Sequence, residues 1–293
     1  MAISQDTVTD YYDSPYLAEN YELQETYPGA SRDVDVHWKT ISQIRKLKIA
    51  NNEPESVVVL DVGSGTGRIL EGLDRLATKS PGSLTESTFI GLDQSQHMVD
   101  FAKQKNTCLT QFRKVSWICD QATDLAQALA TSEGKDAKVD LLVIAIGTIS
   151  HFTKPGEAQQ VFNHVASVLR PHTGRACISA LFMDDWSTWD EAEHEGMSAE
   201  VKDYPSKIFP ETIYRNSISG YEEDGKLNTT KCKVEVIQKS PDGEEKVIQT
   251  MSTLFKLRTW TEEEFLSDIK AAGLNVLDKD TNGMDTIFIL GTS

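Results

Sequence analysis

The chain has 293 residues, 39% of them hydrophobic, and a formal net charge of −16. That length and composition suffice for the core of one large domain, with or without a cap, and exclude disorder throughout. A surface this acidic repels phosphate, so we expect no nucleic-acid partner and no membrane binding through basic side chains.

The cysteines and the hydrophobic pattern indicate a soluble cytoplasmic protein. The four cysteines are widely spaced and form no CxxC pair, which is typical of reduced thiols (Cys108, Cys119, Cys177 and Cys232). The first ten residues lack an apolar signal segment, and no stretch approaches the roughly 18 apolar residues that a membrane span needs.

Residues 1–52 are predicted to form an N-terminal helical segment that precedes the core. Four tyrosines lie among acidic residues near the start of the chain (Tyr11, Tyr12, Tyr16 and Tyr21). From Asp33 to Ala50, apolar side chains recur at spacings of three and four, which is the pattern of one buried helix face. This segment leads into the predicted core, residues 53–182.

The stretch 57–69 is the centre of that core. An apolar run from Val57 to Leu60 predicts a strand buried on both faces, and a helix-like pattern begins at Arg68. Three glycines at alternate positions separate the two (Gly63, Gly65 and Gly67). Glycine permits a sharp turn and close approach of a ligand, and the helix N-terminus supplies free N–H groups. We infer a nucleotide-type cofactor site.

Strands and helices then alternate as far as residue 182. The further predicted strands cover residues 88–92, 115–119, 139–146 and 175–182, each pair separated by a helical pattern. Five such alternations imply βαβ units, and therefore a mainly parallel, doubly wound sheet.

The pattern changes in residues 183–257, which we interpret as a cover over the substrate. Its first part is acidic, has no clear period and contains Trp186 and Trp189. Three β-rich runs follow, and their connections contain Asp224-Gly225 and Asp242-Gly243, which are hairpin signals. Residues 258–293 are predicted to add a helix with a capping box at Thr261 and the last two strands of the core.

Acidic residues occur at successive strand ends and strengthen the cofactor interpretation. Asp61 lies near the end of the first strand, Asp93 closes the second and Asp120 closes the third. In an open α/β sheet these ends converge on one crevice, where an acid can accept hydrogen bonds from a ribose diol. The alternative is that Asp93 and Asp120 only cap helices and that Asp61 only fixes the loop.

The glycine spacing limits the choice of cofactor. It lacks the full GxGxxG of dinucleotide enzymes, so a NAD-dependent dehydrogenase is the weakest reading. No Lys-Ser or Lys-Thr follows the glycines, which excludes a P-loop.

The run Leu60-Asp61-Val62-Gly63-Ser64-Gly65-Thr66-Gly67, followed by Gly91-Leu92-Asp93 and Cys119-Asp120, resembles the class I S-adenosylmethionine-dependent methyltransferases. The loop from Gly147 to Phe152 is similar to that of the glycine N-methyltransferase type of small-molecule enzyme. The resemblance implies an α/β fold: a doubly wound, seven-stranded Rossmann-like sheet with an N-terminal helical lid and an antiparallel β flap. It also implies methyl transfer from S-adenosylmethionine to an N or O atom of a small molecule.

The resemblance assigns cofactor-binding roles to specific residues. The three glycines would pack against the methionine part of the cofactor, with Asp61 orienting the loop or the amino group. Asp93 would hold the ribose hydroxyls, and Asp120 would accept from the adenine amino group. The remaining implied contacts come from Ser64, Gln94, Met98, Gln121, the carbonyl of Ile146 or Gly147, and the lid tyrosines Tyr12 and Tyr21.

The candidate catalytic residues are His151, as a general base, and Tyr21. His151 follows the fourth strand and is expected to face the crevice, although it could instead only tie down backbone. Trp186 and Trp189, with His151, would line the substrate pocket, and we expect no metal. A cyclase or isomerase on the same fold and a non-catalytic partner subunit are the alternatives. We expect a monomer or homodimer.

Overall fold

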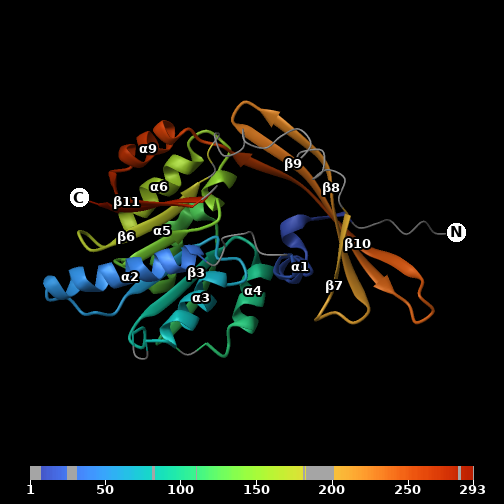
Figure 1. Ribbon diagram of the computed structural model, residues 1–293, viewed down its shortest axis with the longest axis horizontal. Helices are drawn as coiled ribbons and strands as arrows, with labels where there is room; N and C mark the ends of the chain where they lie inside the picture. The colour runs from blue at the N-terminus through green and yellow to red at the C-terminus, as the bar shows by residue number, and fades with distance from the viewer. Residues whose placement is uncertain are drawn as a thin grey trace. The chain divides into compact units, whose positions relative to one another are not determined.

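The structure is a computed structural model that describes residues 8–24, 32–80, 83–109, 111–180, 182, 201–282 and 285–292. The chain divides into two compact units (Figure 1). The smaller unit contains residues 1–26 and 183–259, and the larger contains residues 27–182 and 260–293. Trp186 and Trp189 lie outside the described residues.

The larger unit is built on a seven-stranded mixed sheet. Its strands are β2 (Val58–Val62), β3 (Thr88–Asp93), β4 (Lys114–Cys119), β5 (Leu141–Ile144), β6 (Arg175–Ala180), β11 (Leu274–Asn282) and β12 (Asp285–Thr292). The order is β11-β12-β6-β5-β2-β3-β4. The strands β2 to β6 are parallel, whereas β12 runs antiparallel to both β6 and β11.

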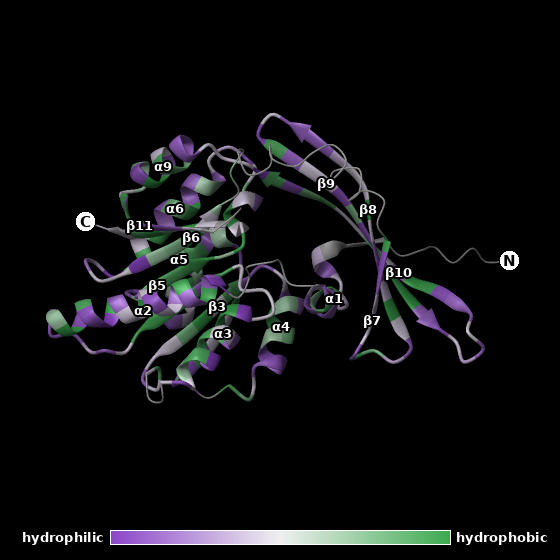
Figure 2. Ribbon diagram, in the orientation of Figure 1, coloured by the Kyte–Doolittle hydropathy of each residue, from purple (hydrophilic) through white to green (hydrophobic). Residues whose placement is uncertain are grey.

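Helices cover both faces of this sheet, as the doubly wound prediction requires. One face is covered by α5 (Leu125–Glu133), α6 (Glu157–Val168) and α9 (Glu262–Ala271), the other by α2 (Arg32–Ala50) and α3 (Arg68–Ala77) (Figure 1). Along β2 the apolar side chains alternate: Leu60 packs into the first layer and Val59 into the second. The strands are accordingly the most hydrophobic part of the unit (Figure 2). A further helix, α4 (Gln96–Lys105), connects β3 to β4.

Helix α2 lies in the larger unit, whereas the sequence analysis grouped it with the rest of the N-terminal segment 1–52. The sequence identifies the helix correctly, but the helix belongs to the larger unit. Its apolar stripe packs with β2 and α3 through Val34, Ile41 and Ile44, which are at most 2% exposed. Burial of that stripe fixes the helix on the sheet.

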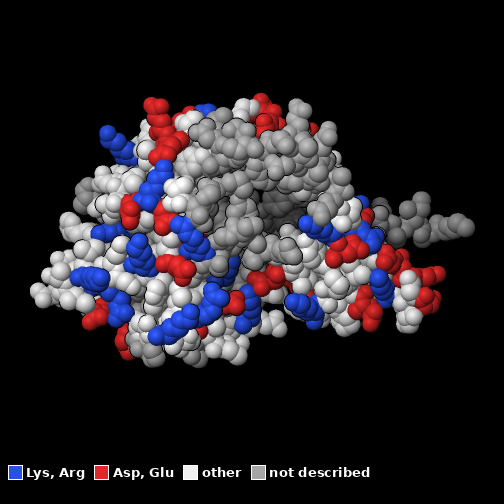
Figure 3. Space-filling view, in the orientation of Figure 1, with Lys and Arg blue, Asp and Glu red and all other residues white. Residues whose placement is uncertain are grey.

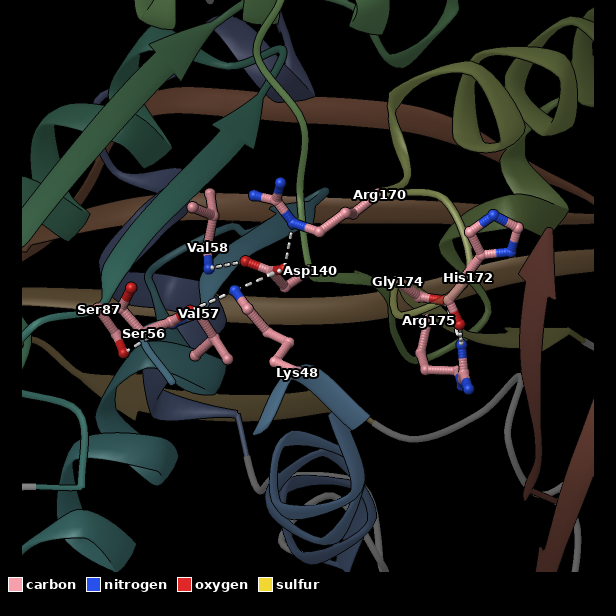
Figure 4. Close-up of polar contacts among 10 residues, drawn as sticks. All are labelled: Lys48, Ser56, Val57, Val58, Ser87, Asp140, Arg170, His172, Gly174 and Arg175. Carbon is pink, nitrogen blue, oxygen red and sulfur yellow. Dashed lines mark hydrogen bonds and ion pairs between the residues drawn. The ribbon is translucent and has the colours of Figure 1, made fainter. Parts of the chain in front are cut away.

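A buried charge cluster closes the amino-terminal edge of the parallel strands. Asp140 Oδ1 accepts from Lys48 Nζ at 3.0 Å and from Arg170 Nε at 2.6 Å, and Oδ2 accepts the Val58 N–H at 2.8 Å (Figure 4). Since Asp140 is fully buried, these donors offset the cost of removing its charge from water. The cluster ties α2, β2 and the end of α6 together at the sheet edge opposite Asp93.

The smaller unit contains a five-stranded sheet in the order β1-β10-β9-β8-β7. The strands are β1 (Val8–Asp10), β7 (Val201–Pro205), β8 (Thr212–Asp224), β9 (Leu227–Lys239) and β10 (Glu245–Arg258). The two predicted hairpins are present, with Gly225 and Gly243 at positive φ in the turns. Neither edge strand of this sheet was predicted. The strand β1 pairs parallel with β10, and β7 pairs antiparallel with β8.

The short helix α1 (Leu17–Leu23) is fastened to this sheet by polar side chains. Glu19, only 3% exposed, accepts from Ser206 Oγ and Tyr214 Oη at 2.6 Å each, and from the N–H groups of Lys207 and Ile208. Asn20 and Asn216 exchange side-chain amide hydrogen bonds. The carboxylate with four donors holds α1 in one orientation on β8.

Charged side chains of both signs lie on the surface, and the cysteines form no disulfide bonds among themselves. Acidic and basic side chains are interspersed on the face drawn in Figure 3. All four cysteines are free thiols. Within the described part of the chain, no helix has the length and hydropathy to cross a membrane.

Candidate functional site

The glycine-rich loop between β2 and α3 has the backbone that only glycine adopts readily. Gly63, Gly65 and Gly67 have φ of +75°, +52° and +87°. The N–H groups of Gly63 and Ser64 donate to the Leu92 carbonyl at 2.8 and 3.0 Å, which ties the loop to β3. Space beside the loop is open at Gly65, where an added Cβ would meet no atom within 4 Å. The loop therefore presents its backbone closely to a ligand.

Asp93, at the end of β3, lies directly against this loop. Its Oδ2 accepts the Gly65 N–H at 2.8 Å and its Oδ1 accepts the Ser95 N–H at 2.9 Å. Burial raises the pKa of Asp93, and these two backbone donors oppose that rise. Each carboxylate oxygen keeps a second acceptor position, so Asp93 can still receive hydroxyl donors.

Asp120 lies next to Asp93 on the neighbouring strand end. The Asp120 N–H donates to the Asp93 carbonyl at 3.1 Å, and its side chain is exposed. Its Oδ1 accepts the N–H of Gln121, another exposed residue. The structure thus brings the two strand-end acids together at the carboxyl edge of the sheet. Asp93 does not cap α4; Ser95 does, through the Met98 N–H.

Asp61 is the most unusual of the three acids. It is 2% exposed, and its Oδ2 has no hydrogen-bond partner among the described residues. Burial raises the pKa of Asp61 to about 7, against the attraction of Arg68, which is paired with Asp33. The buried Ser64 Oγ likewise has no partner within the described part of the chain. Such orphaned polar atoms below a ligand-binding loop suit a polar group brought by the ligand.

The turn after β5 forms the other side of the site. It lies at the switch point of the sheet, between β5 and β2, where ligands bind in open α/β folds. Ile146 and Gly147 both have positive φ, +47° and +64°, and the Thr148 N–H closes the turn onto the Ala145 carbonyl at 3.1 Å. Ser179 Oγ accepts the Gly147 N–H at 3.1 Å. Ile146 keeps a side chain that is 40% exposed.

This turn touches the glycine-rich loop. A Cβ added at Gly63 would lie 2.6 Å from Thr148 Cγ2. His151 ends the 3-10 helix η3 (Thr148–His151) that follows, and its residue surface is exposed. Partial desolvation by the surrounding protein nevertheless lowers the pKa of His151, which favours the neutral imidazole.

The predicted cofactor residues of the larger unit gather at one sheet edge. The glycines, Asp61, Asp93, Asp120, Ile146 and Gly147 all lie at or after the carboxyl ends of β2 to β5. Gln94 is exposed beside them, and Met98 is 6% exposed on α4. Tyr12 and Tyr21 belong to the smaller unit, where Tyr12 packs edge-on against Phe255 and Tyr21 is 43% exposed.

Sequence reasoning missed several residues that shape the site. Thr148 and Ser179 hold the turn after β5, and Asn106 and Trp117 lie against the glycine-rich loop. The one available signal was Asn106, an Asn that follows a predicted helix, as a C-terminal cap often does. The described residues contain no cluster of three or more His, Cys, Asp or Glu side chains able to hold a metal ion.

This arrangement defines a nucleotide-type cofactor site on a doubly wound α/β sheet, and comparison with known proteins identifies its class. Residues 59–172 match a family model described as a methyltransferase domain. The chain is 32% identical over 284 residues to the N-methyltransferase FrzE of a Cladobotryum species, covering 96% of both chains. The chain therefore belongs to the class I S-adenosylmethionine-dependent methyltransferases, as the sequence motifs predicted.

Solved structures show the same fold at low sequence identity. The sugar N-methyltransferase KedS8 from a Streptoalloteichus species is 15% identical with a TM-score of 0.63, over 100% of this chain and 98% of that one. CalS10, an amino pentose methyltransferase of Micromonospora echinaspora solved with bound S-adenosylmethionine, is 14% identical with a TM-score of 0.57, over 94% and 95% of the two chains.

Proposed function

We propose that the protein transfers the methyl group of S-adenosylmethionine to a nitrogen atom of a small molecule. The observation that carries the proposal is the similarity to the N-methyltransferase FrzE, which extends over 96% of both chains and therefore includes the segments that we propose cover the substrate. The sequence alone had left N and O acceptors open. The net charge of −16 favours a cationic or neutral acceptor, such as an amine, over an anionic one.

The site supports specific contacts with the cofactor. The unpartnered Oδ2 of Asp61 is suited to the cofactor ammonium, and the Asp93 carboxylate to the ribose hydroxyls. Asp120 and Gln121, exposed at the end of β4, would contact the adenine edge, together with Gln94 and Met98. Gly63, Ser64, Gly65 and Gly67 would face the methionine part, together with the turn at Ile146 and Gly147. The bound cofactor supplies an already activated methyl group.

His151 is the proposed general base. An amine is protonated at neutral pH and must lose a proton before its lone pair can attack. The lowered pKa of His151 favours the neutral imidazole, the form that can accept that proton. Its position in η3, directly after the turn at Ile146, places it at the carboxyl edge of the sheet.

The smaller unit is proposed to supply the substrate cover. Tyr12 and Tyr21 would contribute to cofactor contact, and Tyr21 to catalysis. Trp186 and Trp189 would line the acceptor pocket with His151. The four free cysteines support a reducing, cytoplasmic location.

Incubation with methyl-labelled S-adenosylmethionine and panels of small amines, phenols and carboxylic acids tests the proposal. We expect label in a product that is one methyl group heavier, with amines as the best acceptors. Methylation only of phenols or acids would overturn the nitrogen assignment. A product of unchanged mass would indicate isomerisation instead.

The His151→Gln variant tests the base with Gln160→Ala, an exposed change on α6, as control. We expect about a 100-fold loss of kcat with little change in the affinity for S-adenosylhomocysteine. Equal activity of the two variants from pH 6 to 9 would remove His151 from the mechanism.

A further inference from the structure

The indole of Trp117 occupies the space that two glycines leave beneath the cofactor loop. On the sheet, Gly91 is in register with Asp61 on one side and with Trp117 on the other, so the three residues share one face. A Cβ added at Gly91 would lie 2.4 Å from both Cε3 and Cζ3 of the indole. One added at Gly67 would lie 2.8 Å from its Cη2. Any larger residue at either glycine would push the indole away.

Asn106 ties the same loop to the end of helix α4. The side chain is 8% exposed, and Nδ2 donates to the Ala102 carbonyl at 2.8 Å and to the Thr66 carbonyl at 3.2 Å. The peptide that joins Thr66 to Gly67 is therefore held at both ends, because the Gly67 N–H donates to the Ser64 carbonyl at 2.9 Å. This peptide immediately precedes α3, and its orientation sets that of the loop.

We propose that Asn106 and Trp117 are positioning residues for S-adenosylmethionine. They hold the glycine-rich loop in its ligand-accepting form from below, while Asp93 holds it from the side through Gly65. A loop fixed before binding loses less conformational freedom when the cofactor enters. The inference concerns the cofactor, so it does not depend on which atom receives the methyl group.

The variant Asn106→Asp separates hydrogen bonding from packing. The two side chains have the same shape, but a carboxylate facing the carbonyls of Thr66 and Ala102 cannot donate to either. We expect the Kd for S-adenosylhomocysteine, measured by calorimetry at pH 7.5, to rise about 10-fold or more. Asn163→Asp, the same change at an exposed position of α6, is the matched control and should bind as the wild type does.

Tryptophan emission provides a readout that a purely structural role would not move. Since the Trp117 indole touches the loop, cofactor binding should change the emission of the wild type. That change should disappear in Trp117→Phe and persist in Trp38→Phe, which alters a half-buried indole on α2. This measurement still tests the proposal if Asn106→Asp fails to fold, because it does not use that variant. Wild-type affinity in a folded Asn106→Asp, or an unchanged emission response in Trp117→Phe, would overturn the proposal.

Discussion

Asp93 and Gly65 are joined by a 2.8 Å hydrogen bond that crosses from the end of β3 to the glycine-rich loop after β2. The carboxylate proposed to hold the ribose is thus already engaged in shaping the loop. Ligand binding and loop conformation share one side chain, and changes at Asp93 should affect both.

The Asp93→Asn variant tests whether the hydrogen bond between Asp93 and Gly65 matters for cofactor binding. An amide that keeps its oxygen toward Ser95 turns its N–H groups toward the Gly65 N–H, so that contact becomes a clash of donors. We expect the Kd for S-adenosylhomocysteine to rise about 10- to 100-fold, the range for losing a hydrogen bond to a charged group. Asp100→Asn, on the exposed side of α4, is the control. Unchanged calorimetric affinity would mean that the Gly65 contact does not matter for binding.

Cofactor affinity should depend on pH through Asp61. Its pKa is raised to about 7 in the free protein, so much of it is protonated below that pH. An ammonium placed at Oδ2 favours the carboxylate and lowers this pKa, so binding below pH 7 releases a proton. Affinity should therefore rise with pH up to about 7 and then level off. Calorimetry in buffers of different ionisation enthalpy measures the released proton directly. An Asp61→Asn variant that keeps the same pH dependence would contradict this assignment.

The turn after β5 should become more stable when Ile146 is replaced by Asn. A β-branched residue at φ +47° is strained, whereas Asn followed by Gly is the preferred pair where both central residues have positive φ. We expect Ile146→Asn to raise the free energy of unfolding by about 0.5–1 kcal/mol in urea titration. Ile49→Asn makes the same exchange at an exposed helical position and should not stabilise. Equal or lower stability of Ile146→Asn would show that the turn carries no strain.

The four hydrogen bonds accepted by Glu19 should stabilise the packing of α1 on the sheet of the smaller unit. Glu19→Ala removes the acceptor of four hydrogen bonds and leaves the buried Tyr214 hydroxyl without this partner. We expect a loss of about 2–4 kcal/mol in local stability, seen as faster hydrogen exchange in α1 and β8. Glu22→Ala changes an exposed acid of the same helix and should leave exchange nearly unchanged. Hydrogen exchange as slow in Glu19→Ala as in the wild type would show that these hydrogen bonds do not stabilise α1 and β8.

The sheet of the larger unit was predictable because its strands are apolar and separated by clear turn residues. The short edge strands β1 and β7 were not, because each is formed by backbone pairing to a distant or neighbouring strand and carries few apolar side chains. Likewise, periodicity identifies α2 but not the surface on which it packs. That choice depends on which apolar faces the sheet leaves to cover.

In the site, too, the residues with a local sequence pattern were predictable and those whose role depends on packing were not. Asp61, Asp93 and the glycines were recognisable because their chemistry and spacing have few other uses. Trp117 was not, because its role depends on the strand register that sets it beside Gly91, and Asn106 offered only its position after a predicted helix. Gly91 belonged to the recognisable motif, and the register adds that it leaves room for the indole of Trp117.

The interleaving of the two units bears on how the protein is made. β1 leaves the ribosome first, yet its partner β10 is synthesised only after the whole β8–β9 hairpin. The sheet of the larger unit likewise needs β12, which lies between β6 and β11 in the sheet but follows both of them in the chain. Each sheet therefore joins strands that are far apart in the sequence, and such contacts slow folding because the intervening chain must first be brought together.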